Sequence, residues 1–259
     1  MKRSMNRMVV ASALFSAIAA TSFGQDRMKP EATEIYSPVP PVVTPGVNFG
    51  LPPSDAIVLF DGKNLDQWMS VNDSSTAKWT LSDNAMTVNK SSGDIQTKSS
   101  FSDYQLHIEY LIPSNITGSG QARGNSGIFL AALPWGAGGY ELQVLDNYKN
   151  TTYVNGQVGS IYKQAVPLAN ASRKPGEWQY YDVIWTAPKW NDNGTMQSLA
   201  RVTVIHNGVL VQNNVTLLGD TPYIGMPSYR KHGAAPIKLQ SHGDKSEPIS
   251  FRNIWVRPL

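Results

Sequence analysis

The sequence predicts an all-β protein, an antiparallel β-sandwich of the jelly-roll kind. Short segments in which apolar and polar residues alternate recur along the chain, and turns rich in glycine and proline separate them. Only short stretches are compatible with a helix. The chain has 259 residues, enough for one large sandwich with a substantial core. It has no cysteine, which excludes disulfides, thiolate metal sites and a cysteine nucleophile.

The first 24 residues are typical of a secretory signal peptide. Lys2, Arg3 and Arg7 precede an uncharged stretch over 8–20, and small residues follow it. We expect cleavage after Gly24, with Ala19 as the alternative, and a periplasmic or secreted protein. The apolar run is shorter than the roughly 20 residues that a membrane span needs, so no span is expected after signal removal.

Removal of the signal changes the charge of the chain. The formal net charge of +3 comes from 22 basic and 19 acidic residues, and loss of three basic residues leaves 19 of each. A neutral mature protein without a basic stripe is not expected to bind nucleic acid.

Residues 25–54 are rich in proline and poor in large apolar side chains, which predicts an extended linker or a strap over the domain surface. The folded domain is expected over residues 55–259. Within it, the segment 104–112 alternates so cleanly that one face should be apolar and the other wet. Asn207-Gly208 is typical of a type I′ hairpin turn within 201–211. The remaining strands are expected at 56–60, 79–81, 85–88, 128–131, 139–147, 178–185, 236–242 and 249–256.

Two of these strands carry polar side chains that need an explanation. Period two places Glu141 and Gln143 on one face of their strand, opposite Leu142 and Val144. A buried carboxylate without a partner is costly, so such a face is expected to border water or a polar cleft. The strand 236–242 repeats the pattern, because Lys238, Gln240 and His242 share one of its faces.

Further candidates lie in loops. A glycine- and serine-rich loop over 118–127 carries Arg123 and Asn125, and Trp135 and Tyr162 are near enough in sequence to provide stacking surfaces. An acid, an imidazole, amides and a guanidinium are suited to a carbohydrate, because sugar hydroxyls both donate and accept hydrogen bonds.

Seven blocks, in this order, resemble the 3-keto-disaccharide hydrolase family. The blocks are LFDGKNLDQW (59–68), GNSGIF (124–129), YELQVLDN (140–147), GSIY (159–162), HNGV (206–209), LQSHG (239–243) and FRNIWV (251–256). The resemblance extends from about residue 56 to 259. It implies a concanavalin A-like jelly roll in an exported bacterial protein that acts on sugars oxidised at C3. One departure is a loop over 190–197, at the rim of the pocket, that is longer than the family resemblance leads us to expect.

The implied chemistry begins with the ketone, which makes the proton at C2 acidic. A base can remove this proton, and the substituent at C1 is then expelled. Water can add back to complete a hydrolysis. Such a site needs a base and a group that stabilises the enolate. We expect Glu141 or His242 as the base, Arg123 with Gln143 or Gln240 at the enolate oxygen, and Tyr162 at the leaving group. A divalent metal held by Glu141 and His242 is an alternative way to stabilise the enolate.

Asn125, Asp146, Lys238 and Trp135 are expected to help bind the sugar. Two other functions remain open. Glu141, Gln143 and Asp146 have the spacing of the three-carboxylate strand motif of laminarinase-like retaining glycosidases, but this function would need a β-bulge before Asp146. The same polar face could also belong to a lectin-like module without catalysis.

Overall fold

The structure, a computed structural model, describes residues 28–135 and 138–259. The expected signal peptide, residues 1–24, lies outside the described residues. The chain divides into two compact units, Met1–Val42 and Val43–Leu259. In the described part of the first unit the regular element is one short 3-10 helix, η1 (Pro30–Thr33). Within the described ranges, no helix has the length and apolar character needed to cross a bilayer.

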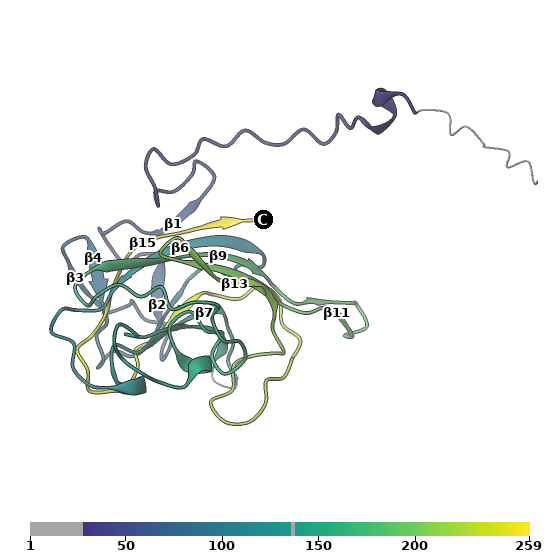
Figure 1. Cartoon of the computed structure of the whole chain (residues 1–259). Helices are drawn as coiled ribbons and strands as arrows, with labels where there is room; N and C mark the ends of the chain where they lie inside the picture. The colour runs from purple at the N-terminus through teal and green to yellow at the C-terminus, as the bar shows by residue number, and fades with distance from the viewer. Residues whose placement is uncertain (1–27, 136–137) are drawn as a thin grey trace, which may run out of the picture. The chain divides into compact units, whose positions relative to one another are not determined.

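The second unit is an antiparallel β-sandwich, so the predicted fold class is confirmed. Its larger sheet has the strand order β13-β12-β9-β6-β15-β4-β3, and β1 pairs with β15. Figure 1 shows β6, β9, β13 and β15 in one layer and β2 and β7 in another. The strands of the larger sheet are β1 (Ile57–Phe60), β3 (Thr80–Ser82), β4 (Ala85–Thr87), β6 (Tyr104–Leu111), β9 (Trp178–Thr186), β12 (Arg201–His206), β13 (Val209–Thr216) and β15 (Ser250–Pro258).

The smaller sheet has five strands in the order β2-β5-β14-β7-β8. These are β2 (Trp68–Ser70), β5 (Ile95–Thr97), β14 (Lys238–Leu239), β7 (Ser126–Ala132) and β8 (Gly139–Val144). Strand β7 lies between β14 and β8, which brings residues from distant parts of the chain side by side. Phe129 pairs with Lys238 on one side and with Glu141 on the other. Two 3-10 turns, η2 (Gly120–Ala122) and η3 (Val154–Gly156), lie in the connecting loops.

The long loop that was expected near residue 190 forms a separate two-stranded hairpin. Its strands are β10 (Lys189–Trp190) and β11 (Met196–Ser198). The turn between β12 and β13 is the predicted one, because Asn207 and Gly208 both have positive φ, at 51° and 82°. A type I′ turn requires this backbone conformation at both central positions.

The core fills the space between the two sheets. Tyr104, Leu106 and Ile108 of β6 are fully buried, and so are Leu142 and Val144 of β8. Full burial of an aliphatic side chain stabilises a fold by about 1.5–3 kcal/mol. Buried tyrosines also connect the layers through their hydroxyls. Tyr104 Oη donates to the carbonyl of Leu130 at 2.6 Å, and Tyr181 Oη to the carbonyl of Gln143 at 2.9 Å.

Residues 43–54, expected as part of a linker, belong to the second unit and form a strap against the outer face of the larger sheet. Trp255 Nε1 and Asn253 Nδ2 both donate to the carbonyl of Gly50, at 2.8 and 2.9 Å. The ring of Phe49 lies edge-on to Tyr180, with 5.0 Å between centroids.

The strap corrects one expectation about β6. Its second face was expected to be wet, but His107 on that face is only 1% exposed. The ring stacks between Tyr180 and Trp255, and Nδ1 binds Asp182 Oδ1 at 2.7 Å. The alternation of β6 was predicted correctly. A strap over the domain surface was one of the two alternatives predicted for residues 25–54, but not that it would cover this face of β6.

Candidate active site

A polar cavity of about 390 Å³ lies on the face of the smaller sheet that points away from the core. Residues of β7 and β8, the chain after β14 and three loops line it. The lining residues are Gln121, Ala122, Asn125, Phe129, Glu141, Gln143, Tyr153, Tyr162, Tyr223, Gln240 and His242. Six of the predicted site residues, Asn125, Glu141, Gln143, Tyr162, Gln240 and His242, therefore border one cavity.

The local fold explains why these side chains meet. Glu141 and Gln143 alternate with core residues of β8, so both point away from the core. Between β8 and the segment that carries Gln240, the strand β7 presents Gly127, whose carbonyl accepts from Gln240 N at 2.9 Å. A Cβ at position 127 would lie 2.5 Å from Glu141 Oε1, so the glycine makes the space that the carboxyl group occupies.

Amide groups around the cavity are held in place by one another. Gln143 Nε2 donates to Gln121 Oε1 and to Asn125 Oδ1, each at 3.2 Å, and Asn125 Nδ2 donates to the carbonyl of Gln121 at 2.8 Å. These bonds leave Gln143 Oε1 buried without a partner in the described part of the chain, and Gln240 Oε1 is in the same state. Buried acceptors are normally satisfied, so two such oxygens beside a cavity suit a ligand that brings hydroxyl donors.

Glu141 has an unusual electrostatic environment. Only 6% of the residue is exposed, and burial raises the pKa of its carboxyl group to about 8, although the charge of Lys238 opposes this shift. At neutral pH the group therefore holds its proton and can donate a hydrogen bond.

His242 and a tyrosine cluster complete the lining. The His242 side chain is 35% exposed, and its Nδ1 lies 2.7 Å from Asp244 Oδ2. The hydroxyl oxygens of Tyr153 and Tyr162 are 2.5 Å apart. Burial raises the pKa of Tyr162 above its usual range, and the bond to Tyr153 adds to the shift, so Tyr162 remains a proton donor at any ordinary pH. Lys163 Nζ lies 4.7 Å from the centroid of the Tyr223 ring.

Arg123 and Asp146 do not line the cavity, which corrects their expected role in contact with the sugar. Arg123 Nε binds Asp146 Oδ2 at 2.6 Å, and the Asp146 side chain is 1% exposed. Strand β8 ends at Val144, so strand alternation no longer determines where Asp146 points. A buried carboxylate needs a cation and hydrogen bonds, and Arg123 is engaged in that task.

Lys238 and Trp135 also lie outside the lining. Lys238 Nζ is 3.7 Å from the centroid of the Phe129 ring and 3.3 Å from Asp94 Oδ2. Phe129 thus stands between Lys238 and Glu141, its neighbours on either side. Trp135 packs against the core, and its ring faces the guanidinium of Arg230.

Five lining residues, Gln121, Ala122, Phe129, Tyr153 and Tyr223, were not among the predicted site residues. Period two could have identified Phe129, which shares the face of β7 with Gly127, and Gln121 lies in the loop that was already suspected. Tyr223 lies in a loop, and no sequence pattern there indicates that its side chain reaches the cavity. Among the described residues no group of three or more histidine and acidic side chains is placed to hold a metal.

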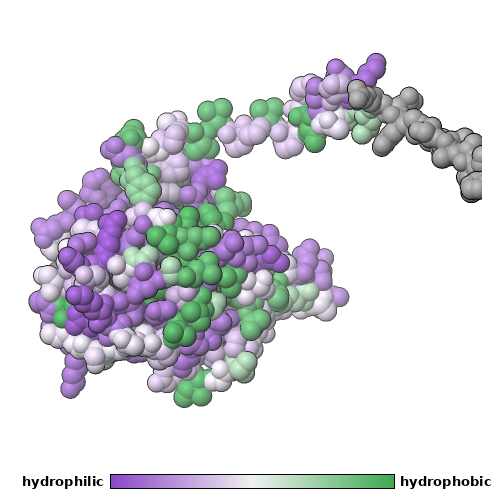
Figure 2. All heavy atoms as spheres, in the orientation of Figure 1, coloured by the Kyte–Doolittle hydropathy of each residue, from purple (hydrophilic) through white to green (hydrophobic). Residues whose placement is uncertain are grey.

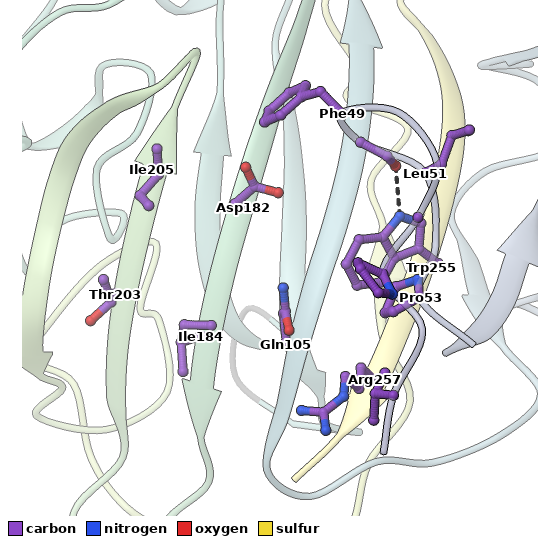
Figure 3. A pocket seen from close by; sticks show the side chains of 14 residues that line it. Phe49, Leu51, Pro53, Gln105, Asp182, Ile184, Thr203, Ile205, Trp255 and Arg257 are labelled. Atoms are coloured by element: carbon purple, nitrogen blue, oxygen red, sulfur yellow. Dashed lines mark hydrogen bonds between the residues drawn. The ribbon is translucent and has the colours of Figure 1, made fainter. Parts of the chain in front are cut away.

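A second hollow, of about 600 Å³, lies between the strap and the outer face of the larger sheet. Figure 3 shows Phe49, Leu51 and Pro53 of the strap facing the sheet residues Ile184, Ile205 and Trp255. Its charged groups are already paired, Asp182 with His107 and Arg257 with Asp55. Figure 2 shows that apolar side chains also gather elsewhere on the visible surface, so an apolar hollow alone does not identify a reaction site.

Comparison with known proteins agrees with this fold. A solved protein of Parabacteroides distasonis, named provisionally as a glycosyl hydrolase, is 58% identical; the match covers 91% of this chain and 99% of that chain, with a TM-score of 0.84. Two more from the same organism, with the same provisional name, are 18% and 21% identical. Their TM-scores are 0.55 and 0.54, and they cover 79% of this chain and 94% and 99% of their own, which supports the fold alone.

No protein with a curated description matches the chain. A family model, described as the 3-keto-alpha-glucoside-1,2-lyase-like domain, matches residues 55–257. This match covers most of the chain and confirms the family that the seven sequence blocks predicted. The protein belongs to the family of 3-keto-alpha-glucoside-1,2-lyase-like domains.

Proposed function

We propose that the protein is an exported carbohydrate-active enzyme that cleaves glycosides carrying a ketone at C3. One observation carries the proposal: Glu141, His242, Gln143 and Gln240 line one cavity of about 390 Å³, and the two glutamine side-chain oxygens are buried without a partner among the described residues. Family membership and the 58% identical glycosyl hydrolase-like protein support a carbohydrate as substrate. That the carbohydrate carries a ketone at C3 is the more specific part of the proposal.

The reaction follows from the acidity that the ketone confers on C2. A base removes the C2 proton, and the electron pair of the broken C2–H bond forms an enolate with a C2–C3 double bond. When the enolate collapses, a C1–C2 double bond forms, the C1–O bond breaks, and the leaving alkoxide takes a proton. The products are an alcohol and an unsaturated keto sugar. Addition of water across the new double bond would complete a hydrolysis.

Glu141 and His242 take different roles in this scheme. Because burial raises the pKa of Glu141 to about 8, its carboxyl group is a poor base at neutral pH but a good hydrogen-bond donor. We assign it to the enolate oxygen, the position for which Arg123 was expected. His242, with its side chain 35% exposed in the lining, is assigned as the base.

The remaining lining residues bind and orient the sugar. Gln143 Oε1 and Gln240 Oε1 would accept hydrogen bonds from sugar hydroxyls, which satisfies two oxygens that otherwise have no donor among the described residues. Tyr162 would protonate the leaving oxygen, since its hydroxyl keeps its proton and is held by Tyr153.

A divalent metal is the alternative part of this proposal, although the described residues hold no group of three or more histidine and acidic side chains that could ligate one. Glu141 and His242 would hold it, and the oxygens of Gln143 and Gln240 lie in the same lining. A bound cation would favour the ionised form of Glu141 and supply Lewis-acid stabilisation of negative charge. Elemental analysis of the purified protein and activity before and after EDTA treatment test this part of the proposal.

The central experiment measures release of a chromogenic aglycone from a 3-keto-glucoside and from the same glucoside before oxidation. We expect cleavage of the keto substrate only, with a primary isotope effect when C2 carries deuterium. His242→Ala should lower kcat by about 10²- to 10⁴-fold through loss of the base. Glu141→Ala should lower kcat by about 10²- to 10³-fold through loss of the donor at the enolate oxygen, and Glu141→Gln, which keeps a donor, should lower it less. Glu177→Gln, which changes an exposed glutamate, is the control and should leave kcat unchanged. Wild-type rates in both alanine variants would contradict the assignment.

The competing functions predict other results. Cleavage of unoxidised glucan would favour a retaining glycosidase, but this requires a second carboxylate near Glu141, and Asp146 is engaged with Arg123 instead. Binding of the keto sugar without product would favour a lectin-like module. Export is tested separately, by cell fractionation and by the mass of the mature amino terminus, which we expect to begin after Gly24.

A further inference from the structure

We propose that Asp244 is a positioning residue that holds His242 in one tautomer and thereby keeps Nε2 free as the proton acceptor. The inference rests on the proposed function of His242 as the base. Asp244 does not line the cavity and touches no position that a substrate there would occupy. It acts through the 2.7 Å contact between its Oδ2 and His242 Nδ1.

The two carboxylate oxygens of Asp244 have different surroundings. Oδ1 accepts from Ser246 N at 2.7 Å, from the hydroxyl of Ser246, and from Lys90 Nζ at 3.2 Å. Oδ2 has His242 Nδ1 as its one hydrogen-bond partner among the described residues. The Asp244 side chain is only 3% exposed, so water does not replace these partners. His242 Nδ1 also lies 3.3 Å from the backbone N–H of Asp244, which could only donate to it. The contact to Oδ2 is much shorter, at 2.7 Å, and its partner is an acceptor-only carboxylate, so it favours a proton on Nδ1.

The carboxylate is itself held firmly. Lys90 Nζ also donates to the carbonyls of Asp244 and Ser246, at 2.8 and 2.7 Å. The Ser246 hydroxyl accepts from Gly124 N at 3.0 Å, which connects the turn to the loop that carries Asn125. Ser246 N, Ser246 Oγ and Lys90 Nζ all donate to Oδ1 of this carboxylate, which suits its charged, acceptor-only form. A fixed, charged acceptor therefore orients the imidazole ring.

This asymmetry makes Asp244→Asn a sharp test. In the variant, the amide oxygen should occupy the Oδ1 position, because Ser246 and Lys90 present donors there. The NH₂ group then faces His242 Nδ1 and donates to it, which forces the proton of the ring onto Nε2. The substitution keeps the shape of the side chain but inverts the tautomer.

The tautomer is read from ¹⁵N chemical shifts of protein labelled in its histidine rings, with EDTA present and at a pH where the ring is neutral. The His242 signals are assigned by their loss in His242→Gln. We expect Nδ1–H in the wild type and Nε2–H in Asp244→Asn, with kcat about 10- to 100-fold lower and KM unchanged. Asp73→Asn is a matched control, because Asp73 accepts from Ser75 N and Oγ in the same kind of turn without a histidine. It should behave as the wild type.

The outcomes separate this inference from the proposed function. An Nε2–H ring in the wild type, or an Nδ1–H ring in Asp244→Asn, would overturn the positioning role whether or not the protein cleaves keto sugars. An inverted tautomer with unchanged kcat would overturn it as well. If the wild type cleaves no keto sugar, the proposed function fails, while inversion in the variant would still support Asp244 as the group that sets the ring of His242.

Discussion

The two hollows of the sandwich differ in a way that size does not reveal. The larger, of about 600 Å³, lies under the strap, and its charged groups are paired with protein partners. The smaller, of about 390 Å³, is lined by two glutamines whose side-chain oxygens are buried with no donor in the described part of the chain, and by a carboxyl group that keeps its proton at neutral pH. The protein satisfies its own polar groups in the first hollow and leaves them for a ligand in the second. Unsatisfied polarity, more than volume, distinguishes the candidate active site.

The largest expected effect tests the smaller hollow, through the contribution of Glu141 to the free energy of unfolding. The pKa of Glu141 is raised to about 8 in the folded protein, against 4.5 for an ordinary glutamate. Between these values the folded state binds a proton that the unfolded state lacks, so the free energy of unfolding falls as pH rises. The slope from this residue is about 1.4 kcal/mol per pH unit.

Glu141→Gln removes the titration, so the variant should become more stable relative to the wild type as pH increases from 5 to 8. Urea unfolding at several pH values measures the difference. A constant difference between the two proteins across that range would show that Glu141 is ionised in the folded state. The exposed Glu177→Gln variant should keep the wild-type dependence.

A smaller effect is expected at the strap. Gly50 has φ of 79°, and an added Cβ would lie 3.0 Å from His107 Nε2. Gly50→Ala should therefore destabilise the fold by about 1–3 kcal/mol through backbone strain and contact with the ring. Gly194→Ala is the matched control, because its φ is 85° and no atom lies within 4 Å of the added Cβ.

Both glycines have positive φ, so comparison of the two alanine variants separates the free-energy cost of the contact with His107 from the cost of the strained backbone. We expect the Gly50 variant to unfold at lower temperature than the Gly194 variant and both to retain the wild-type kcat. A loss of kcat in Gly50→Ala alone would break the distinction between the hollows, because it would connect the strap to catalysis.

The smallest effect is expected from the ion pair at the rim of the larger hollow. Arg257 Nε lies 2.7 Å from Asp55 Oδ2, with the side chains 28% and 37% exposed. Exposed pairs of this kind contribute about 0.2–1 kcal/mol. Arg257→Ala should thus change the free energy of unfolding by no more than that and leave activity unaltered, as measured by urea unfolding and the aglycone assay. A tenfold drop in kcat/KM would assign this hollow a role in the reaction.

Strand patterns allowed the fold and half of the site to be predicted. Glu141 and Gln143 lie where period two places them. Gln240 and His242 also line the cavity, but they follow β14, which ends at Leu239, and Lys238 of the same predicted face lies outside the lining. The rule fails for Asp146, because β8 ends two residues earlier and the carboxylate turns toward Arg123. Period two says nothing beyond the end of a strand.

Other features depend on contacts between distant segments. The outer face of β6 carries polar residues that are typical of a solvent-exposed face. His107 on this face is buried because residues 43–54 pack over it. Tyr223 reaches the cavity from a loop whose path is set by tertiary packing. The raised pKa of Glu141 likewise depends on burial by several segments together, which no local pattern records.

The bond from Tyr181 Oη to the carbonyl of Gln143 has a consequence for how this protein can evolve. It ties the backbone of the strand that carries Glu141 to the opposite layer through a fully buried phenol. The strand at the base of the cavity is therefore fixed by the packing of both sheets, whereas Tyr153 and Tyr223 lie in loops, which generally tolerate sequence change better. Changes in those loops would alter the walls of the cavity and leave Glu141 and Gln143 in place on β8.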